Sequence, residues 1–215
     1  MKKDLTELVF ILDKSGSMHG LEKDTIGGFN SVIEKQKKES GEVIVSTILF
    51  NDSSHVIYDR TNISNISLMT SNEYFVGGCT ALLDAVGTAI TNIINIRKIT
   101  PKASQPEKTI FIITTDGKEN ASVEYSYKKI KQMIETQKEK YKWEFIFLGA
   151  NIDVAKEAEK LGVNGECSVS YHCDSKGLDL CYEGISMAIS ECRAKKDLSK
   201  SKWRKKINAD YKGRQ

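Results

Sequence analysis

The chain has 215 residues, 40% of them apolar, which suits one folded domain with a buried core and excludes wholesale disorder. Its formal net charge of +3 by itself indicates no class of partner, but the charge is unevenly distributed. Residues 193–215 hold ten basic and two acidic residues, a net charge of +8, whereas the first 192 residues hold 22 basic and 27 acidic residues, a net charge of −5.

The first half of the chain begins with a strand, because residues 5–12 (LTELVFIL) are almost continuously apolar, as in a strand covered on both faces. A helical period over 20–40 follows, and Gly27 and Gly28 within it are expected to permit close packing against a sheet. Residues 42–50 predict a second strand, and 55–60 its antiparallel partner in an edge hairpin.

The second half continues the alternation of strands and helices. The pattern predicts a helix over 81–97, a strand over 109–115, a helix over 123–140, a strand over 143–148, a short helix over 153–161, a weak strand over 168–171 and a final helix over 177–194. Such alternation indicates a mostly parallel α/β sheet with helices on both faces.

The sequence predicts neither a membrane-spanning helix nor a signal peptide. The apolar runs are far shorter than the ~20 residues that a spanning helix needs, and the stretch after Met1 is too short for a signal peptide and runs into Asp13. The five cysteines are an odd number, which without a secretion signal indicates reduced thiols. We therefore expect a soluble, cytoplasmic protein.

Three polar loops are expected at one edge of the sheet, since ligands of open α/β sheets bind outside the carboxyl ends of the strands. They are Asp13-Lys14-Ser15-Gly16-Ser17 after the first strand, Gly77-Gly78-Cys79-Thr80 before the second helix, and Asp116-Gly117 after the strand at 109–115. Together they supply two carboxylates and three hydroxyls, an all-oxygen set that suits a hard cation such as Mg²⁺.

These motifs, Asp13-x-Ser15-x-Ser17, Gly78-x-Thr80-x-Leu82-x-Asp84-Ala85 and Asp116-Gly117, resemble the metal-ion-dependent adhesion site (MIDAS) of von Willebrand factor type A (vWA) domains. The resemblance covers about residues 5–195 and is closer to stand-alone bacterial or phage-type members. It implies a three-layer, Rossmann-like fold with one antiparallel edge strand. It also implies that Ser15, Ser17 and Thr80 bind the metal directly, and that Asp13 and Asp116 bind it directly or through water.

The expected function follows from this resemblance. Residues 1–196 would form a vWA domain that binds Mg²⁺, with Mn²⁺ as the alternative, and that has no catalytic residues. The bound metal would accept an Asp or Glu side chain of a partner protein. Residues 197–215 would form a basic, poorly ordered tail.

Two other functions stay open. A metal-dependent phosphohydrolase would use Asp13 as nucleophile, although Ser15 stands where that chemistry typically has a second acid. The basic tail would bind nucleic acid or another anionic surface, with Trp203 and Tyr211 stacking on bases.

Several further residues are assigned minor roles. Asp84 is expected to begin a helix or support the site from behind, His19 to lie on the surface, and Lys118, Glu119 and Asn120 either to rim the site or to start a solvated helix. The spacing of Cys167, His172 and Cys173 matches no strong zinc pattern, so these are interpreted as incidental side chains.

Overall fold

The computed structural model describes residues 1–214 and shows a six-stranded sheet in the order β3-β2-β1-β4-β5-β6. Every neighbouring pair is parallel except β2 and β3, which pair antiparallel at one edge. The strands are β1 (Lys2–Asp13), β2 (Glu42–Phe50), β3 (Ser54–Asn62), β4 (Pro106–Thr115), β5 (Glu144–Gly149) and β6 (Ser168–Ser170). The predicted α/β class and the antiparallel edge hairpin are confirmed.

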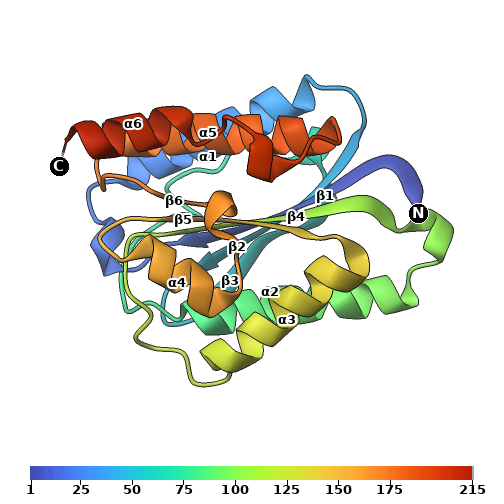
Figure 1. The fold of residues 1–215 in the computed structure, drawn as a ribbon, viewed down its shortest axis with the longest axis horizontal. Coiled ribbons are helices and arrows are strands. Elements are labelled where there is room, and N and C mark those ends of the chain that lie inside the picture. Colours follow the sequence, from blue (N-terminus) through green and yellow to red (C-terminus); the bar gives the residue numbers. More distant parts are fainter. Residues whose placement is uncertain (215) are drawn as a thin grey trace.

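Helices cover both faces of the sheet, giving three layers (Figure 1). The helices are α1 (Glu22–Lys37), α2 (Leu82–Ile99), α3 (Tyr127–Tyr141), α4 (Val154–Leu161), α5 (Ser175–Arg193) and α6 (Lys205–Gly213). In Figure 1, α1, α5 and α6 lie on one face and α2, α3 and α4 on the other. Within residues 1–214, no helix combines the length and the apolar character needed to cross a membrane.

The central strands are buried on both sides, which explains their unbroken apolar sequences. Residues Leu8–Leu12 of β1 and Ile110–Ile113 of β4 have no exposed surface. Phe10 packs edge to face on Phe29 of α1, with ring centroids 5.2 Å apart. This core fixes where β1 and β4 end, and so where the following loops begin.

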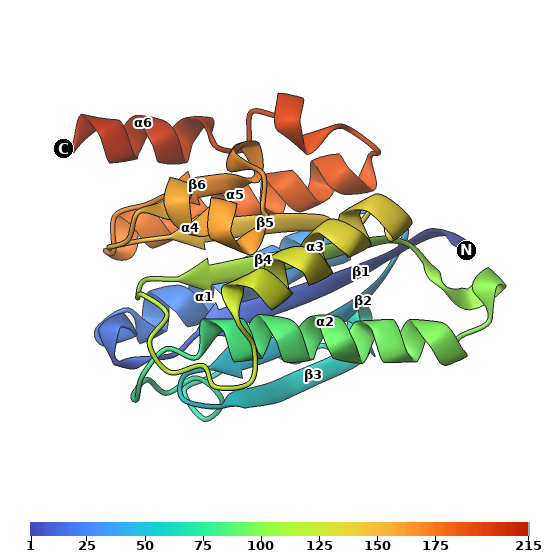
Figure 2. The ribbon, with the colours of Figure 1, turned by 60° about the horizontal axis from the view of Figure 1, so that its bottom comes forward.

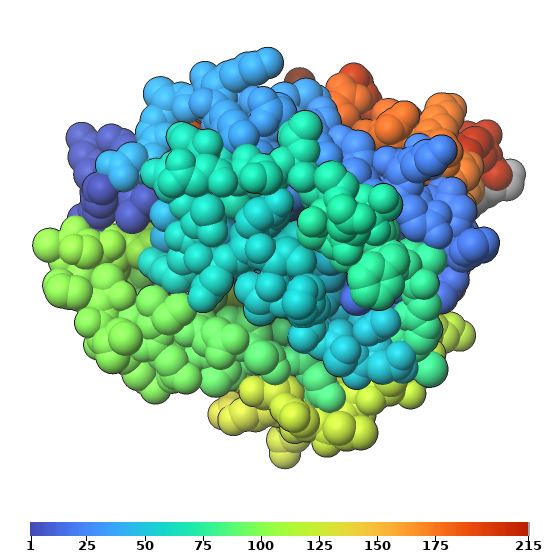
Figure 3. Space-filling view, turned by 180° about the vertical axis from the view of Figure 1, so that it is seen from behind, coloured from blue at the N-terminus to red at the C-terminus, as the bar shows by residue number. Residues whose placement is uncertain are grey.

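One detail of the first half differs from expectation. Gly28 allows a close approach, but to α5 rather than to the sheet: a Cβ there would lie 2.0 Å from the Tyr182 ring, whereas one on Gly27 would meet nothing within 4 Å. The long connection from β3 to α2 carries no regular strand or α-helix. In the space-filling view, β3 and this connection occupy the centre of one face of the molecule (Figure 3).

The structure differs from the expectation of a poorly ordered basic tail, since residues 198–213 contain two helical elements. Residues Leu198–Lys200 form a 3₁₀ turn, and α6 packs against α5 and against the edge strand β6. Trp203 is 2% exposed, as is Ile207. The count of charges missed these apolar side chains, whose burial offsets the entropy cost of ordering the segment.

The basic segment, residues 193–214, also lies against acidic side chains of the first 192 residues. Lys195 pairs with Glu107 at 2.7 Å, Lys206 pairs with Glu183 at 2.5 Å, and Arg214 pairs with Asp174. Exposed ion pairs of this kind contribute little individually. We therefore infer that the buried Trp203 anchors the segment and that charge complementarity orients it.

Gly184 of α5 is the point of closest approach to α6, since a Cβ there would lie 2.7 Å from Ile207 Cδ1 and 3.1 Å from the Trp203 carbonyl oxygen. We expect Gly184→Val to detach residues 198–213, and Trp203→Ala to reduce their local stability by about 3–5 kcal/mol. Limited trypsin digestion and amide exchange of this segment measure the effect. Met187→Ala, at an exposed position of the same helix, is the control. Unchanged protection in Gly184→Val would contradict this packing.

Candidate metal centre

The candidate site lies between β1 and β4, where the order of the strands across the sheet changes direction. Strand β1 connects through α1 to β2 on one side, while β4 pairs with β1 on the other. In open α/β sheets the crevice at such a switch point is the usual place for a ligand. Asp13 is the last residue of β1 and Asp116 follows the last residue of β4, so the topology brings both carboxylates to this crevice.

The Asp13 carboxylate is buried, with 1% of the residue exposed, and both of its oxygens accept hydrogen bonds. Oδ1 accepts from the Ser15 amide at 2.7 Å, and Oδ2 accepts from the Thr115 hydroxyl at 2.5 Å. Burial raises the pKa of Asp13 above its ordinary value, the hydrogen bonds from Ser15 and Thr115 oppose the rise, and the nearby Asp116 charge adds to it. The folded protein thus holds a costly negative charge that a cation would stabilise.

The hydroxyls predicted as ligands gather beside the two carboxylates. Ser15 Oγ lies 3.2 Å from Ser17 Oγ, and the Ser17 hydroxyl donates to Asp116 Oδ1 at 2.5 Å. Thr80 reaches the same place: a Cβ on Gly117 would lie 3.0 Å from Thr80 Oγ1 and 3.3 Å from Ser17 Oγ. Gly117 therefore leaves a space lined by oxygen atoms from three loops.

The loop that carries Thr80 is clamped against the loop after β1. The Gly16 amide donates to the Gly78 carbonyl at 3.0 Å, and the Gly77 amide donates to the Lys14 carbonyl at 2.9 Å. Gly78 has a φ of +78°, and a Cβ there would lie 1.9 Å from Asp52 Oδ2, so only glycine fits. Glycine is thus required at position 78 by its backbone conformation and by the Asp52 side chain, whereas a Cβ on Gly77 would meet nothing within 4 Å.

Side chains from the loop after β4 complete the frame. Asn120 Oδ1 accepts from the Thr80 amide at 2.9 Å, and Glu119 Oε2 accepts from the Leu83 amide at 2.9 Å. Asp84, in the first turn of α2, accepts from three consecutive amides of residues 123–125 at 2.8–3.0 Å. This agrees with the expectation that Asp84 supports the site from a helix start. Asn120 and Glu119 likewise hold loops together.

The arrangement fits a hard divalent cation. Two carboxylates and three hydroxyls converge, Asp13, Ser15, Thr80 and Asp116 are buried, and Ser17 stays exposed, so the site opens to solvent on one side. In residues 1–214, no three or more His, Cys, Asp or Glu side chains are grouped so that they could hold a metal ion, so a cation at this site would also need the hydroxyls. His172 Nε2 lies 3.1 Å from the Tyr211 carbonyl oxygen, and Cys167 is buried.

Three residues at the site were missed from the sequence. Thr115 bonds to Asp13, the Tyr74 hydroxyl donates to the Asp13 carbonyl at 2.6 Å, and Cys173 Sγ lies 3.4 Å from Asp116 Oδ2. Thr115 directly precedes Asp116, so its place in the sequence could have indicated that it lies at the site. No sequence pattern indicated Tyr74 or Cys173, because only the tertiary fold brings the 63–81 connection and the turn after β6 to this end of the sheet.

Two exposed apolar side chains lie in the segments that carry Thr80 and Asp116. Phe75 is 60% exposed, and its ring covers the ammonium of Lys14 at 4.3 Å from the ring centroid. Val123, in the loop after β4, is 91% exposed. His19 lies on the surface, as expected, with its Nδ1 3.4 Å from Glu22.

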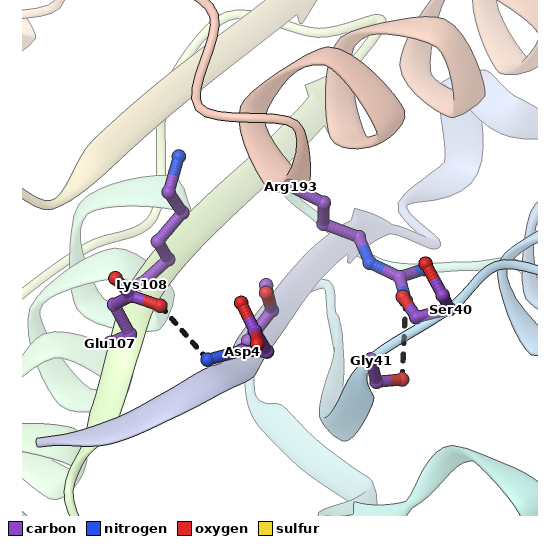
Figure 4. Close-up of a pocket in the computed structure, with 7 residues that line it drawn as sticks. Asp4, Ser40, Gly41, Glu107, Lys108 and Arg193 are labelled. Carbon is purple, nitrogen blue, oxygen red and sulfur yellow. Dashed lines mark hydrogen bonds between the residues drawn. The ribbon is translucent and has the colours of Figure 1, made fainter.

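A polar cavity of about 260 Å³ lies at the other end of the strands from the candidate metal site, where β1, β2 and β4 begin. It is lined by Asp4, Thr6, Ser40, Gly41, Glu107, Lys108 and Arg193 (Figure 4). The Arg193 guanidinium donates to the Ser40 carbonyl at 2.6 Å, and Glu107 accepts from the Asp4 amide at 2.9 Å. Its charged groups are thus engaged in holding segments of the fold together.

Comparisons with known proteins bear on the fold. No protein-family model matches the chain, and no curated protein matches it. Among solved structures, proximal thread matrix protein 1 from the mussel byssus, with a zinc-occupied MIDAS motif, superposes with a TM-score of 0.58 at 14% identity, covering 84% of this chain and 44% of that one. Manganese-loaded TRAP protein of Plasmodium vivax gives 0.56 at 15% identity, covering 84% and 73%.

The ArnB paralog VWA2 from Sulfolobus acidocaldarius gives a TM-score of 0.53 at 19% identity, covering 83% of this chain and 44% of that one. The chain therefore spans less than half of the length of the mussel and Sulfolobus proteins. At these identities the likeness shows the fold alone. The three-layer vWA fold expected from the motifs is confirmed.

Gly117 offers a test of the oxygen-lined space. We expect Gly117→Ala to weaken divalent-metal binding at least tenfold, because its Cβ would press on the hydroxyls of Thr80 and Ser17. Isothermal titration with Mg²⁺ and Mn²⁺ measures the change. Gly27→Ala is the matched control, since its Cβ meets nothing within 4 Å, and it should stabilise α1 by up to about 1 kcal/mol. Equal affinities in both variants would contradict the placement of the site.

Asp13 offers a second test, based on its raised pKa. Because the folded state disfavours the charged carboxylate, the ionised group costs stability at neutral pH, and Asp13→Asn should raise Tm in EDTA by about 2–4 °C per kcal/mol removed. With metal at a hundredfold excess over Kd, the wild type should gain about 2.7 kcal/mol and overtake the variant. Asp179→Asn, at an exposed position of α5, should change neither value. Without this reversal of order on adding metal, Asp13 would not face a cation.

Proposed function

We propose that the chain is a non-enzymatic protein-binding module, in which a divalent cation at an intact MIDAS accepts a carboxylate of a partner protein. The observation that carries the proposal is the oxygen cluster across the β1–β4 switch point. There Ser17 Oγ lies 2.5 Å from Asp116 Oδ1 and 3.2 Å from Ser15 Oγ, with the Thr80 hydroxyl beside the same space.

The metal we propose is Mg²⁺, with Mn²⁺ as the alternative. Ser15, Ser17 and Thr80 would hold it with their hydroxyls, and Asp13 and Asp116 would bind directly or through water. All of these ligands are hard oxygen donors, which favour Mg²⁺ and Mn²⁺ over softer ions. The zinc-occupied and manganese-loaded sites of the mussel and Plasmodium proteins support a divalent cation more generally.

A carboxylate is the partner group that best suits this site. When bound, the cation would supply an electrophilic centre, because three of its five protein ligands are neutral hydroxyls. Ser17 is exposed, so the open side of the site faces solvent and an incoming side chain. Phe75, in the connection that carries Thr80, is 60% exposed and would add apolar contact area for a partner surface.

The two other functions receive less support. A nucleophilic carboxylate needs a free, accessible oxygen, whereas both Asp13 oxygens accept hydrogen bonds inside the protein. Stacking on nucleic-acid bases needs an exposed aromatic ring, whereas Trp203 is buried against the body. We therefore propose neither hydrolysis nor nucleic-acid binding.

We also propose that the protein works in the cytoplasm and belongs with the stand-alone bacterial or phage-type vWA members. Support for the location is that all five cysteines, Cys79, Cys167, Cys173, Cys181 and Cys192, carry free thiols, the state that a reducing compartment maintains.

Capture of partners from native lysate tests the function. We expect the wild type to retain a specific protein in Mg²⁺, to release it in EDTA, and to lose it when Asp13 or Asp116 is changed to Ala. Mutating each acidic residue of the captured protein to its amide should then identify one carboxylate whose loss abolishes binding.

The matched control for capture is Gly27→Ala, which should retain the partner. Retention of the partner in EDTA and by Asp116→Ala would show that binding bypasses the metal. A captured protein insensitive to every acid-to-amide change would contradict the carboxylate part of the proposal.

A further inference from the structure

Cys173 is the one thiol in contact with a proposed metal ligand in residues 1–214. It lies in the turn between β6 and α5, and its Sγ is 3.4 Å from Asp116 Oδ2. The other oxygen of that carboxylate accepts the Ser17 hydroxyl at 2.5 Å. The Asp116 carboxylate is therefore held at both oxygens, and Cys173 sets the orientation of the one that faces away from Ser17.

The geometry of this contact suits a hydrogen bond that the thiol donates. An S–H group is a weak donor, and a sulfur–oxygen distance of 3.4 Å suits such a bond. The contact is thus a hydrogen bond from the thiol to the carboxylate.

Helix α6 binds the residues on both sides of Cys173. His172 Nε2 lies 3.1 Å from the Tyr211 carbonyl oxygen, and the His172 and Tyr211 rings pack with centroids 4.8 Å apart. Arg214 forms two hydrogen bonds to the Asp174 carboxylate. In Figure 2, the C-terminus lies on the same side of the molecule as the arrowheads of β4 and β5.

The turn is also fixed from the side of α5. Asp174 caps this helix by accepting the Gly177 amide at 2.8 Å. A Cβ on Gly177 would lie 1.9 Å from the His172 carbonyl oxygen, so the first turn of α5 packs directly on the backbone of the turn. Cys173 is consequently held between the first turn of α5 and the contacts that residues 211–214 make to His172 and Asp174.

We propose that Cys173 is a positioning residue for the metal site, which orients Asp116 through its thiol and is itself held in place by α6. This inference rests on the proposed metal binding. It gives the basic segment a role distinct from nucleic-acid binding: the docked α6 keeps the metal site in the arrangement that binds a cation.

The expected size of the effect follows from the weakness of the donor. Groups that orient a metal ligand typically change metal affinity by about 10–100-fold when mutated, and a thiol should lie at the lower end. Cys173→Ala should thus weaken Mg²⁺ and Mn²⁺ binding about tenfold. Cys173→Ser should restore affinity to within about threefold of the wild type, because a hydroxyl donates to the same oxygen.

The experiment titrates full-length variants with Mn²⁺ alone, followed by the loss of the free-ion EPR signal, and with Mg²⁺ alone by calorimetry. Tm in EDTA is measured for each variant. If Cys173 served only as a small apolar side chain, Ser would be the more harmful change and Ala the milder one. The order of affinities, Ser above Ala, therefore distinguishes positioning from packing.

A second pair of variants tests the role of α6. Arg214→Gln removes the double contact to Asp174 and should weaken Mn²⁺ binding about two- to threefold. Lys212→Gln removes the same charge from an exposed position of α6 and should have no effect. Equal affinities for these two variants would overturn the part of the proposal that concerns α6.

The remaining outcomes separate this inference from the proposed function. Wild-type affinity in Cys173→Ala, or equal losses in Cys173→Ala and Cys173→Ser, would overturn the positioning role while metal binding stands. If the wild type bound neither ion more tightly than Asp116→Ala, the metal site itself would be wrong, and this inference would fall with it.

Discussion

The close approach of two carboxylates at the ends of adjacent buried strands is the constraint around which this structure is organised. Asp13 and Asp116 end up in one crevice because β1 and β4 pair directly. Burial raises the pKa of Asp13, and Asp116 adds to that rise. Such charges, placed together, suit a cation, and the neighbouring hydroxyls are the kind of neutral oxygen that a hard cation also prefers.

Contacts between the loops hold these carboxylates and hydroxyls in position. The glycine-rich loop before Thr80 packs backbone to backbone on the loop after β1. Asn120 and Glu119 tie the loop after β4 to α2. Each of these contacts involves a backbone amide or carbonyl, so the loops are joined without using the hydroxyls of Ser15, Ser17 and Thr80.

The structure changes the interpretation of the basic segment, residues 193–214. By composition it is a charged terminus, and ten basic residues favour solvation. In the fold, Trp203 and Ile207 are buried against α5, while Lys195, Lys206 and Arg214 lie beside acidic residues of the body. The basic segment, net charge +8, thus packs against the rest of the chain, net charge −5. It also contacts the turn between β6 and α5, which carries Cys173.

Sequence reasoning succeeded where a local pattern was enough. The strand at 42–50 was predicted with its observed bounds, because a buried strand is a continuous apolar run between turn residues. The helix predicted from 123 instead begins at Tyr127, after Ser126, whose side chain accepts from the Lys129 amide. Residues 123–125 are drawn to Asp84 instead, through a contact about 40 positions away that periodicity does not register.

By itself, the sequence determined the fold class, the position of the three polar loops and the oxygen chemistry of Asp13, Ser15, Ser17, Thr80 and Asp116. These follow from short-range patterns and from the rule that parallel strands end at one edge. Only the tertiary structure decided that Thr115 bonds to Asp13, that Cys173 touches Asp116 and that α6 docks on α5. The reason is physical: such contacts join residues far apart in the chain, and a few buried side chains outweigh the average composition of the segment that carries them.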